Sequence, residues 1–324
     1  MNNQRHNRRG DIVVCALITL FVGMFFQVPT ASAVPSYARQ TGFPCKSCHM
    51  MPPELTALGR AFKLNGYTLV SKPTVTSTGT KREGGLAILE SFPLSALFDT
   101  SFSATKSPQP GTQNGSFEFP QDASLFLAGE WAPHVGSFIQ VTYETQGDNF
   151  SWDNTDIRYA NSTKLFQKDF AYGITLNNNP TVEDLWNSTP AWGFPPITSG
   201  SAPSPNAAAL INGTLGMDVA GVGGYAMWNN HLYIAGTIYR SEHIGAAQPL
   251  DGLDFPVNIR GVAPYWRVAW QQTSKNNSLM VGTYGMHVKS SPEGITGPED
   301  SFTDWAFDFQ YDRTIPRFGG DVLS

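Results

Sequence analysis

The balance of apolar and polar residues changes twice along the chain. Residues 12–28 are largely apolar, three arginines precede them, and Ala31-Ser32-Ala33 follows with small residues at cleavage positions. This layout is typical of a secretory signal peptide. The alternative is a retained membrane anchor, but the apolar run is shorter than the ~20 residues that a spanning helix needs. We therefore predict that residues 1–33, including Cys15, are removed on export.

In the last three quarters of the chain, bulky apolar residues alternate with small or polar ones. Trp305, Phe307 and Phe309, for example, are separated by Ala306 and Asp308. A period of two indicates β-strands whose two faces differ chemically. A soluble sandwich turns its apolar face inward, whereas an outer-membrane barrel turns that face toward lipid and keeps the polar face inside. The alternation alone does not say which face is which.

The lengths of the connections favour the barrel. Tight or short turns near residues 131, 228–231 and 273–277 are interleaved with longer connections at 106–116, 179–215, 242–258 and 291–302. Only the gap at 147–152 departs from this order. Such a pattern is typical of periplasmic turns and extracellular loops. We predict a mainly β protein with a transmembrane antiparallel β-barrel, and a periplasmic β domain is the alternative. The expected strands, about ten, are 85–105, 117–131, 136–146, 153–161, 169–178, 216–228, 231–241, 259–272, 278–290 and 303–312.

The last twelve residues, RTIPRFGGDVLS, follow Asp312 as a turn and the beginning of a further strand. An outer-membrane barrel normally finishes on a complete terminal strand with an aromatic last residue. We therefore expect the C-terminus of the barrel to be incomplete, with several strands missing.

Charge excludes one class of partner. Without the three arginines and the one aspartate of residues 1–33, 18 basic and 25 acidic side chains remain, a net charge of −7. No basic patch is present to meet phosphates, so we expect no nucleic-acid partner. After residue 33 no apolar run approaches the length of a membrane helix, and any membrane contact must come from a closed barrel.

The clearest chemistry lies in Cys45-Lys46-Ser47-Cys48-His49. Two cysteines three positions apart can add their thiols to one edge of a porphyrin, and the adjacent histidine can ligate the iron. A zinc site would need two further Cys or His ligands, which residues 50–133 lack. A disulfide would not explain the histidine, and a thioredoxin-type motif would need a βαβ context. We predict one covalent haem c, held by Cys45 and Cys48, with His49 as an axial ligand.

A short helix is predicted after the motif. Pro53 suits its first position, and Asn65-Gly66 suits its end. Leu55, Leu58 and Phe62 recur at helical spacing and form a stripe that can lie against the haem. The motif and this helix belong to a small haem-bearing head, residues 34–80. Because this head is too small to build a stable core alone, we expect it to pack into the mouth or lumen of the barrel.

The sixth iron ligand is not visible near the motif. Met50 and Met51 follow His49 too closely to reach the opposite haem face, and residues 52–133 contain no Met, His or Cys. The alternatives stay open: no protein ligand, the new α-amine of Val34, or a distant side chain. The distant candidates are His134, Met217, Met227, His231, His243, Met280, Met286 and His287.

Several charged residues have two interpretations. Arg60 and Lys63 could meet haem propionates, but we expect both on a solvated helix face. An acidic lumen could attract cations such as Fe²⁺, but we expect its carboxylates to be solvated lumen residues. These carboxylates are Glu130, Glu144, Asp304 and Asp308.

One family has a similar head. Residues 35–69, PSYARQTGFPCKSCHMMPPELTALGRAFKLNGYTL, resemble the haem domain of the fused cytochrome–porins, the outer-membrane monohaem cytochromes of iron-oxidising bacteria. The match covers about 35 residues, and the β region resembles the family only in pattern. The resemblance implies the same three haem residues, Cys45, Cys48 and His49, and nothing beyond them. The stretch Met50-Met51-Pro52-Pro53 differs slightly from the family pattern, in which a Thr or an aromatic residue is expected after the histidine.

The predicted organisation is a signal peptide (1–33), a monohaem cytochrome head (34–80) and an outer-membrane barrel (81–324). The expected function is electron transfer across the outer membrane of a Gram-negative bacterium. Extracellular Fe(II) is a candidate donor, and a periplasmic cytochrome or another soluble carrier is the expected partner. Whether Fe(II) oxidase activity accompanies this stays open. The alternatives are a porin whose haem is a structural plug and a periplasmic haem sensor or carrier.

Overall fold

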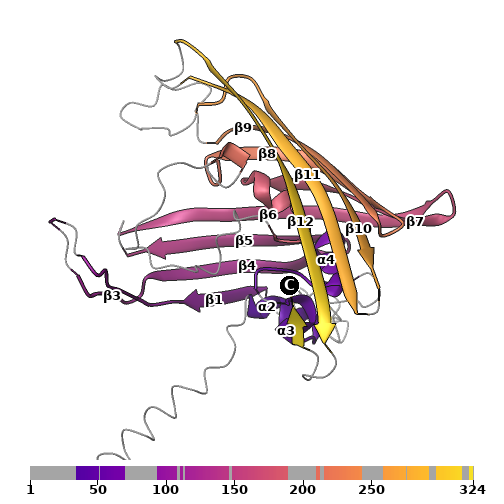
Figure 1. Cartoon of the computed structure of the whole chain (residues 1–324), viewed down its shortest axis with the longest axis horizontal. Helices are drawn as coiled ribbons and strands as arrows, with labels where there is room; N and C mark the ends of the chain where they lie inside the picture. Colours follow the sequence, from indigo (N-terminus) through magenta and orange to yellow (C-terminus); the bar gives the residue numbers. More distant parts are fainter. Residues whose placement is uncertain are drawn as a thin grey trace, which may run out of the picture. The chain divides into compact units, whose positions relative to one another are not determined.

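More than half of the residues that the structure describes form one antiparallel sheet whose strands follow the sequence order (Figure 1). The computed structural model describes residues 34–50, 52–69, 93–107, 110–111, 114–145, 148–188, 209–211, 215–242, 258–274, 276–291, 297–315 and 321–323. The predicted signal peptide lies outside the described residues. Residues Val34–Ser324 belong to one compact unit.

Three short helices make up the head: α2 (Pro35–Thr41), α3 (Cys45–Cys48) and α4 (Ala57–Leu64). The predicted start of the last helix at Pro53 is wrong, because the Thr56 hydroxyl accepts the backbone N–H of Gly59 and caps a helix that begins at Ala57. Its predicted end is confirmed: Asn65 is the C-cap, and Gly66 adopts a φ of 69°. In the described part of the chain, no helix is long and apolar enough to cross a membrane.

The described strands confirm that the protein is mainly β. The large sheet has the order β1-β4-β5-β6-β7-β8-β9-β10-β11-β12-β13. Its strands are β1 (Leu94–Phe98), β4 (Asp122–Ala132), β5 (Val135–Glu144), β6 (Asn149–Leu165), β7 (Lys168–Asn177), β8 (Val219–Trp228), β9 (Leu232–Ser241), β10 (Ala263–Thr273), β11 (Asn277–Ser290), β12 (Asp300–Ile315) and β13 (Asp321–Leu323). A separate ladder pairs β2 (Ser101–Ser103) with β3 (Ser116–Glu118). Within the described residues, β1 pairs only with β4 and β13 only with β12.

Two predicted strands are broken. The stretch 85–105 contains β1 and β2, and the stretch 117–131 contains the end of β3 and most of β4, while residues 85–92 are outside the described part. Both breaks lie at one place, where the Asp99 carboxylate accepts the backbone N–H of Asp122 at 3.0 Å and the Asp99 carbonyl accepts that of Gln121 at 2.8 Å. A side chain that bonds to backbone competes with the regular ladder. The sequence pattern does not reveal this competition.

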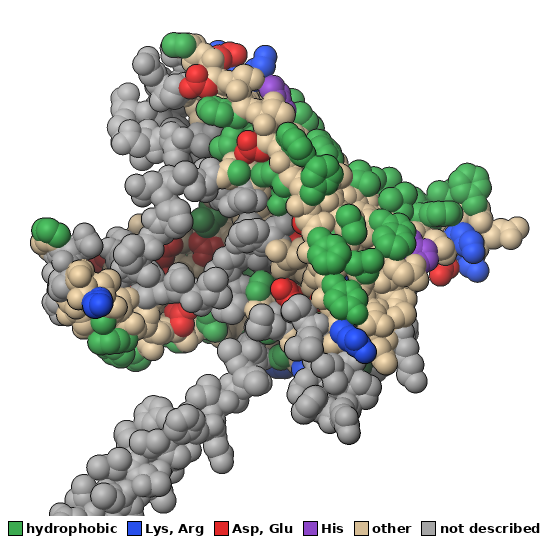
Figure 2. Space-filling view, viewed as in Figure 1, with side chains coloured by type: hydrophobic (Ala, Val, Ile, Leu, Met, Phe, Trp, Pro, Cys, Tyr) green, Lys and Arg blue, Asp and Glu red, His purple; other side chains and the backbone are tan. Residues whose placement is uncertain are grey.

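The two faces of the sheet differ in exposure and in chemistry. On β12 the aromatic side chains are exposed, Phe307 by 73%, while Gln310 is buried on the other face. On β7, Ile174 is exposed and Thr175 is fully buried. Figure 2 shows hydrophobic side chains gathered along the outside of the later strands. The bulky apolar face is therefore the outer one.

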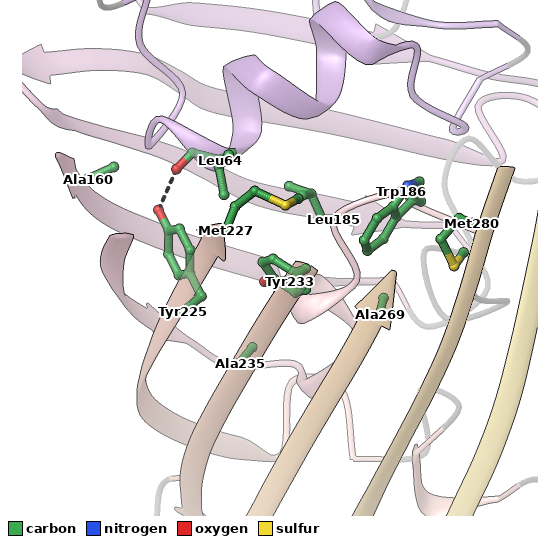
Figure 3. Packing of buried hydrophobic residues seen from close by; sticks show 10 residues of the cluster. All are labelled: Leu64, Ala160, Leu185, Trp186, Tyr225, Met227, Tyr233, Ala235, Ala269 and Met280. Atoms are coloured by element: carbon green, nitrogen blue, oxygen red, sulfur yellow. Dashed lines mark hydrogen bonds between the residues drawn. The ribbon is translucent and has the colours of Figure 1, made fainter. Parts of the chain in front are cut away.

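The inner face is covered by the chain itself. After β7, residues Asn178–Ser188, called here the internal segment, contain the 3-10 helix η1 (Pro180–Glu183), and residues 178–187 are all buried. Leu185 and Trp186 of this segment pack with Leu64 of α4 and with side chains of the inner face, as Figure 3 shows. The long connection expected at 179–215 thus begins with an ordered stretch inside the protein.

Candidate haem c site

The motif cysteines lie on the single turn of α3. The backbone N–H of His49 donates to the carbonyl of Cys45 at 2.9 Å and closes this turn. Cys45 and Cys48 are both half-buried, and neither forms a disulfide. Burial raises the pKa of the Cys48 thiol, and the nearby Cys45 adds to the effect. Two thiols one helical turn apart lie on the same side, which is the arrangement that thioether attachment to one porphyrin edge requires.

A tight loop returns the chain from the motif to α4. His49 and Leu55 form an isolated antiparallel bridge, and the N–H of Met50 donates to the carbonyl of Glu54 at 3.2 Å. Thr56 closes the loop: its N–H donates to the Cys48 carbonyl at 2.9 Å, and its hydroxyl donates to the Ser47 carbonyl at 2.6 Å. The loop therefore fixes the backbone on both sides of His49.

Gly59 allows α3 and α4 to touch. A Cβ at this position would lie 2.1 Å from the carbonyl oxygen of Cys48, a backbone atom that cannot move aside. The sequence interpretation missed this residue, although a glycine inside a helical pattern signals a close approach of another element. Thr56 was missed as well, and the signal for it is a threonine directly before a helical run.

The His49 imidazole is suited to bind a metal. It is half-buried, and its Nδ1 atom is buried without a hydrogen-bond partner among the described residues. Burial lowers the pKa of His49, while the facing carbonyls of Pro53 and Glu54 oppose this shift. A neutral imidazole is the form that ligates iron, and a nearby carbonyl is its usual partner on the other nitrogen. The two thiols and this histidine therefore fit a c-type haem.

Arg60 and Lys63 contradict the prediction of a solvated helix face, since both are buried. The Lys63 ammonium donates to the Asp184 carbonyl at 2.7 Å and to Asn187 Oδ1 at 2.8 Å. Arg60 donates to the Leu55 carbonyl at 2.8 Å and to Ser278 Oγ at 3.0 Å. Burial lowers the pKa of Lys63 to about 7. The physical reason for the error is that α4 lies against the internal segment and β11, which supply polar partners inside the protein.

The predicted apolar stripe does not face one surface. Phe62 packs against Tyr37 and Tyr67, with ring centroids 5.0 and 6.2 Å away. Leu55 is buried near the loop, whereas 36% of Leu58 is exposed. Because Phe62 serves the contact with the sheet, only part of the stripe remains for a haem.

A charged network lies beneath the head. Arg158 pairs with Asp156 at 2.7 Å, both are fully buried, and the Tyr67 hydroxyl donates to the same carboxylate at 2.5 Å. Arg267 pairs with Asp184 at 2.9 Å. The network ties the head, the internal segment and the inner face of the sheet together. The alternation predicted polar inner positions but not which of them would pair.

The candidates for a sixth ligand are spread over the protein. Met227 and Met280 belong to the cluster that contains Leu64 of α4, and Val34 belongs to the cluster of Phe62. The two other described methionines lie elsewhere: Met286 belongs to a third cluster, and Met217 is exposed. The described histidines have other neighbours. The ring of His134 lies beside Tyr159, His231 is hydrogen-bonded to Gln271, and His287 is hydrogen-bonded to Thr303. His243 lies outside the described residues. The sixth ligand stays unassigned.

The acidic residues expected in a solvated lumen have separate environments. Asp308 does not fit that expectation, since it accepts from Arg267 at 2.5 Å. Asp304 accepts the backbone N–H of Leu210 at 2.7 Å, Glu130 is half-buried and Glu144 is exposed. The described residues contain no cluster of three or more acidic, His or Cys side chains that could hold a metal ion. Asp308 instead neutralises a buried arginine.

Comparisons with known proteins add no relative. No protein-family model, no curated protein and no solved structure matches the chain. The resemblance of residues 35–69 to the cytochrome–porins therefore stays a prediction that rests on the head alone.

Proposed function

We propose that the chain is an outer-membrane electron-transfer protein, in which Cys45 and Cys48 attach one haem c and His49 ligates its iron. The observation that carries the proposal is a CxxCH turn packed on α4, a helix that is bound to the internal segment and to the inner face of a sheet whose outer face is apolar. Lys63 contacts the internal segment, and the Tyr225 hydroxyl of the inner face donates to the Leu64 carbonyl at 2.9 Å.

The exposed face supports the membrane part of the proposal. Exposed aromatic and aliphatic side chains repeat along neighbouring strands, including Trp266, Val268 and Trp270 on β10 and Trp305 and Phe307 on β12. A soluble protein rarely exposes a continuous apolar face of this extent. A transmembrane barrel has its apolar residues outside and its charges inside. Because lipid does not tolerate open edges, the proposal requires the edges at β1 and β13 to be paired in the membrane.

The residues of the head have defined roles in this proposal. When bound, a c-type haem would accept and release one electron at its iron. Cys45 and Cys48 would fix its position, and His49 would hold the metal through a neutral imidazole nitrogen. Thr56 and Gly59 keep the motif turn against α4. The inner face of the sheet excludes bulk water from the side of the head that it covers.

The proposal also includes an electron donor and an electron acceptor. We propose extracellular Fe(II) as the candidate donor and a soluble periplasmic carrier as the partner. Stopped-flow absorbance of intact cells mixed with Fe(II) tests this function, with cells that carry the Cys45→Ala/Cys48→Ala chain as the control. Haem reduction on the timescale of turnover is expected only with the unchanged chain. If the haem is not reduced on that timescale, Fe(II) is not the donor.

Fractionation separates the alternatives. Recovery of the haem-bearing chain in the outer-membrane fraction is expected. A haem-bearing chain in the periplasmic fraction would favour a soluble haem sensor or carrier. An outer-membrane chain with haem that no donor reduces would favour a porin-like protein in which the haem is a structural plug.

A further inference from the structure

The internal segment holds the loop that surrounds His49. Asn187 Nδ2 donates to the carbonyl of Pro53 at 3.2 Å, and the backbone N–H of Leu55 donates to the carbonyl of Trp186 at 3.2 Å. Leu55 is the bridge partner of His49, and Pro53 belongs to the loop between them. Two neighbouring residues of the internal segment thus contact two residues of the loop that follows the histidine.

The internal segment is itself fixed to the sheet. Asp184 pairs with Arg267 of β10, and Glu183 accepts from Thr237 of β9 at 2.6 Å. The Trp186 indole donates to Gln271 at 3.2 Å. All of these side chains are buried. The position of the His49 loop is therefore set by the inner face of the sheet and not by the head alone.

We propose that Asn187 is a positioning residue for haem ligation, which sets the orientation of His49 by holding the Pro53 carbonyl of the loop. This inference rests on the proposed haem c. When Asn187 no longer donates, the loop loses one of its bonds to the internal segment, and the imidazole is held less firmly in one orientation. The orientation and the surroundings of an axial histidine tune the potential of a haem.

Three variants of the full chain test the proposal. Asn187→Ala removes both side-chain bonds, and Asn187→Asp keeps an acceptor for Lys63 but removes the donor to Pro53. Asn178→Ala is the matched control, because Asn178 is an equally buried residue of the same segment. Its two side-chain bonds go to Asp153 and Thr155 of β6, and both are 2.7 Å long.

The measurement is the midpoint potential of the haem together with the low-spin absorbance spectrum. Both Asn187 variants should show a potential that differs from that of the unchanged chain, and Asn178→Ala should show the same potential as the unchanged chain. A merely structural role of Asn187 predicts that Asn178→Ala has an equal effect. Equal shifts in all three variants, or no shift in either Asn187 variant, would overturn the proposal.

A second measurement does not depend on haem. In the Cys45→Ala/Cys48→Ala chain, hydrogen exchange of the amides of Met50, Glu54, Leu55 and Thr56 reports on the loop directly. Asn187→Ala should speed their exchange by on the order of tenfold, whereas Asn178→Ala should not. Unchanged exchange would remove the physical link from Asn187 to the loop. An absence of covalent haem in the unchanged chain would instead refute the proposed function and leave this link standing.

Discussion

The burial of Lys63 allows a quantitative test of how the head is docked. Burial lowers the pKa of its ammonium from 10.5 to about 7; the positive Arg158 adds to the shift, and nearby carboxylates, Asp184 among them, oppose it. The ammonium retains two protein partners, the Asp184 carbonyl and Asn187 Oδ1. Between about pH 7 and 10.5 the unfolded chain therefore binds more protons at this position than the folded chain. The free energy of unfolding must rise with pH in that window.

The size of the effect follows from the shift. Near pH 6 Lys63 is charged in both states, and the cost of burying the charge is fully present. Near pH 9 the folded chain holds it neutral, while the unfolded chain still keeps it mostly charged. The linkage relation gives a gain of about 2.5 kcal/mol in the free energy of unfolding between these two pH values. Lys63→Met removes the charge at similar length, so this contribution should vanish.

Urea unfolding followed by tryptophan fluorescence in detergent is the suitable assay. The Cys45→Ala/Cys48→Ala chain is the background, because it removes the thiols and the haem from the titration. His49 titrates in both chains, so the difference between the chain with Lys63 and the chain with Lys63→Met isolates the lysine. The exposed Lys168 provides the control variant, Lys168→Met. An equal pH dependence in the chain with Lys63 and in the chain with Lys63→Met would refute the burial of this ammonium.

Four further changes test the site and the sheet. His49→Ala should abolish the low-spin absorbance spectrum, and an unchanged spectrum would contradict its role as a ligand. Gly59→Ala should cost about 1–3 kcal/mol, because the new Cβ meets the carbonyl oxygen of the second motif cysteine, and should reduce the covalent haem content measured as pyridine haemochrome. Arg158→Met should cost about 3–5 kcal/mol in urea unfolding, since Asp156 would remain buried without its cation. Phe307→Lys should cost about 2–4 kcal/mol for folding into lipid vesicles; a cost near zero would argue against a lipid-facing position.

Local sequence patterns predicted most of the later strands of the fold one by one. The alternation around β7 to β12 predicted strands whose bounds agree with the structure within a few residues. It worked because each strand has one apolar and one polar face, which a period of two shows directly. The pattern failed at Asp99, where a side chain bonds to the backbone of another strand. It also failed at Pro53, because the cap of α4 depends on one hydroxyl of Thr56.

The sequence by itself carried the prediction of the motif's chemistry, since Cys45, Cys48 and His49 are close together in the chain and lie on one helical turn and its cap. Tertiary structure alone decided which face of the sheet is outside, because alternation is the same for either choice. It also decided that Lys63 is buried and that Asn187 lies beside Pro53, 134 residues away. These contacts join segments that share no local pattern. They arise only when the internal segment folds back onto the inner face and the head docks against it.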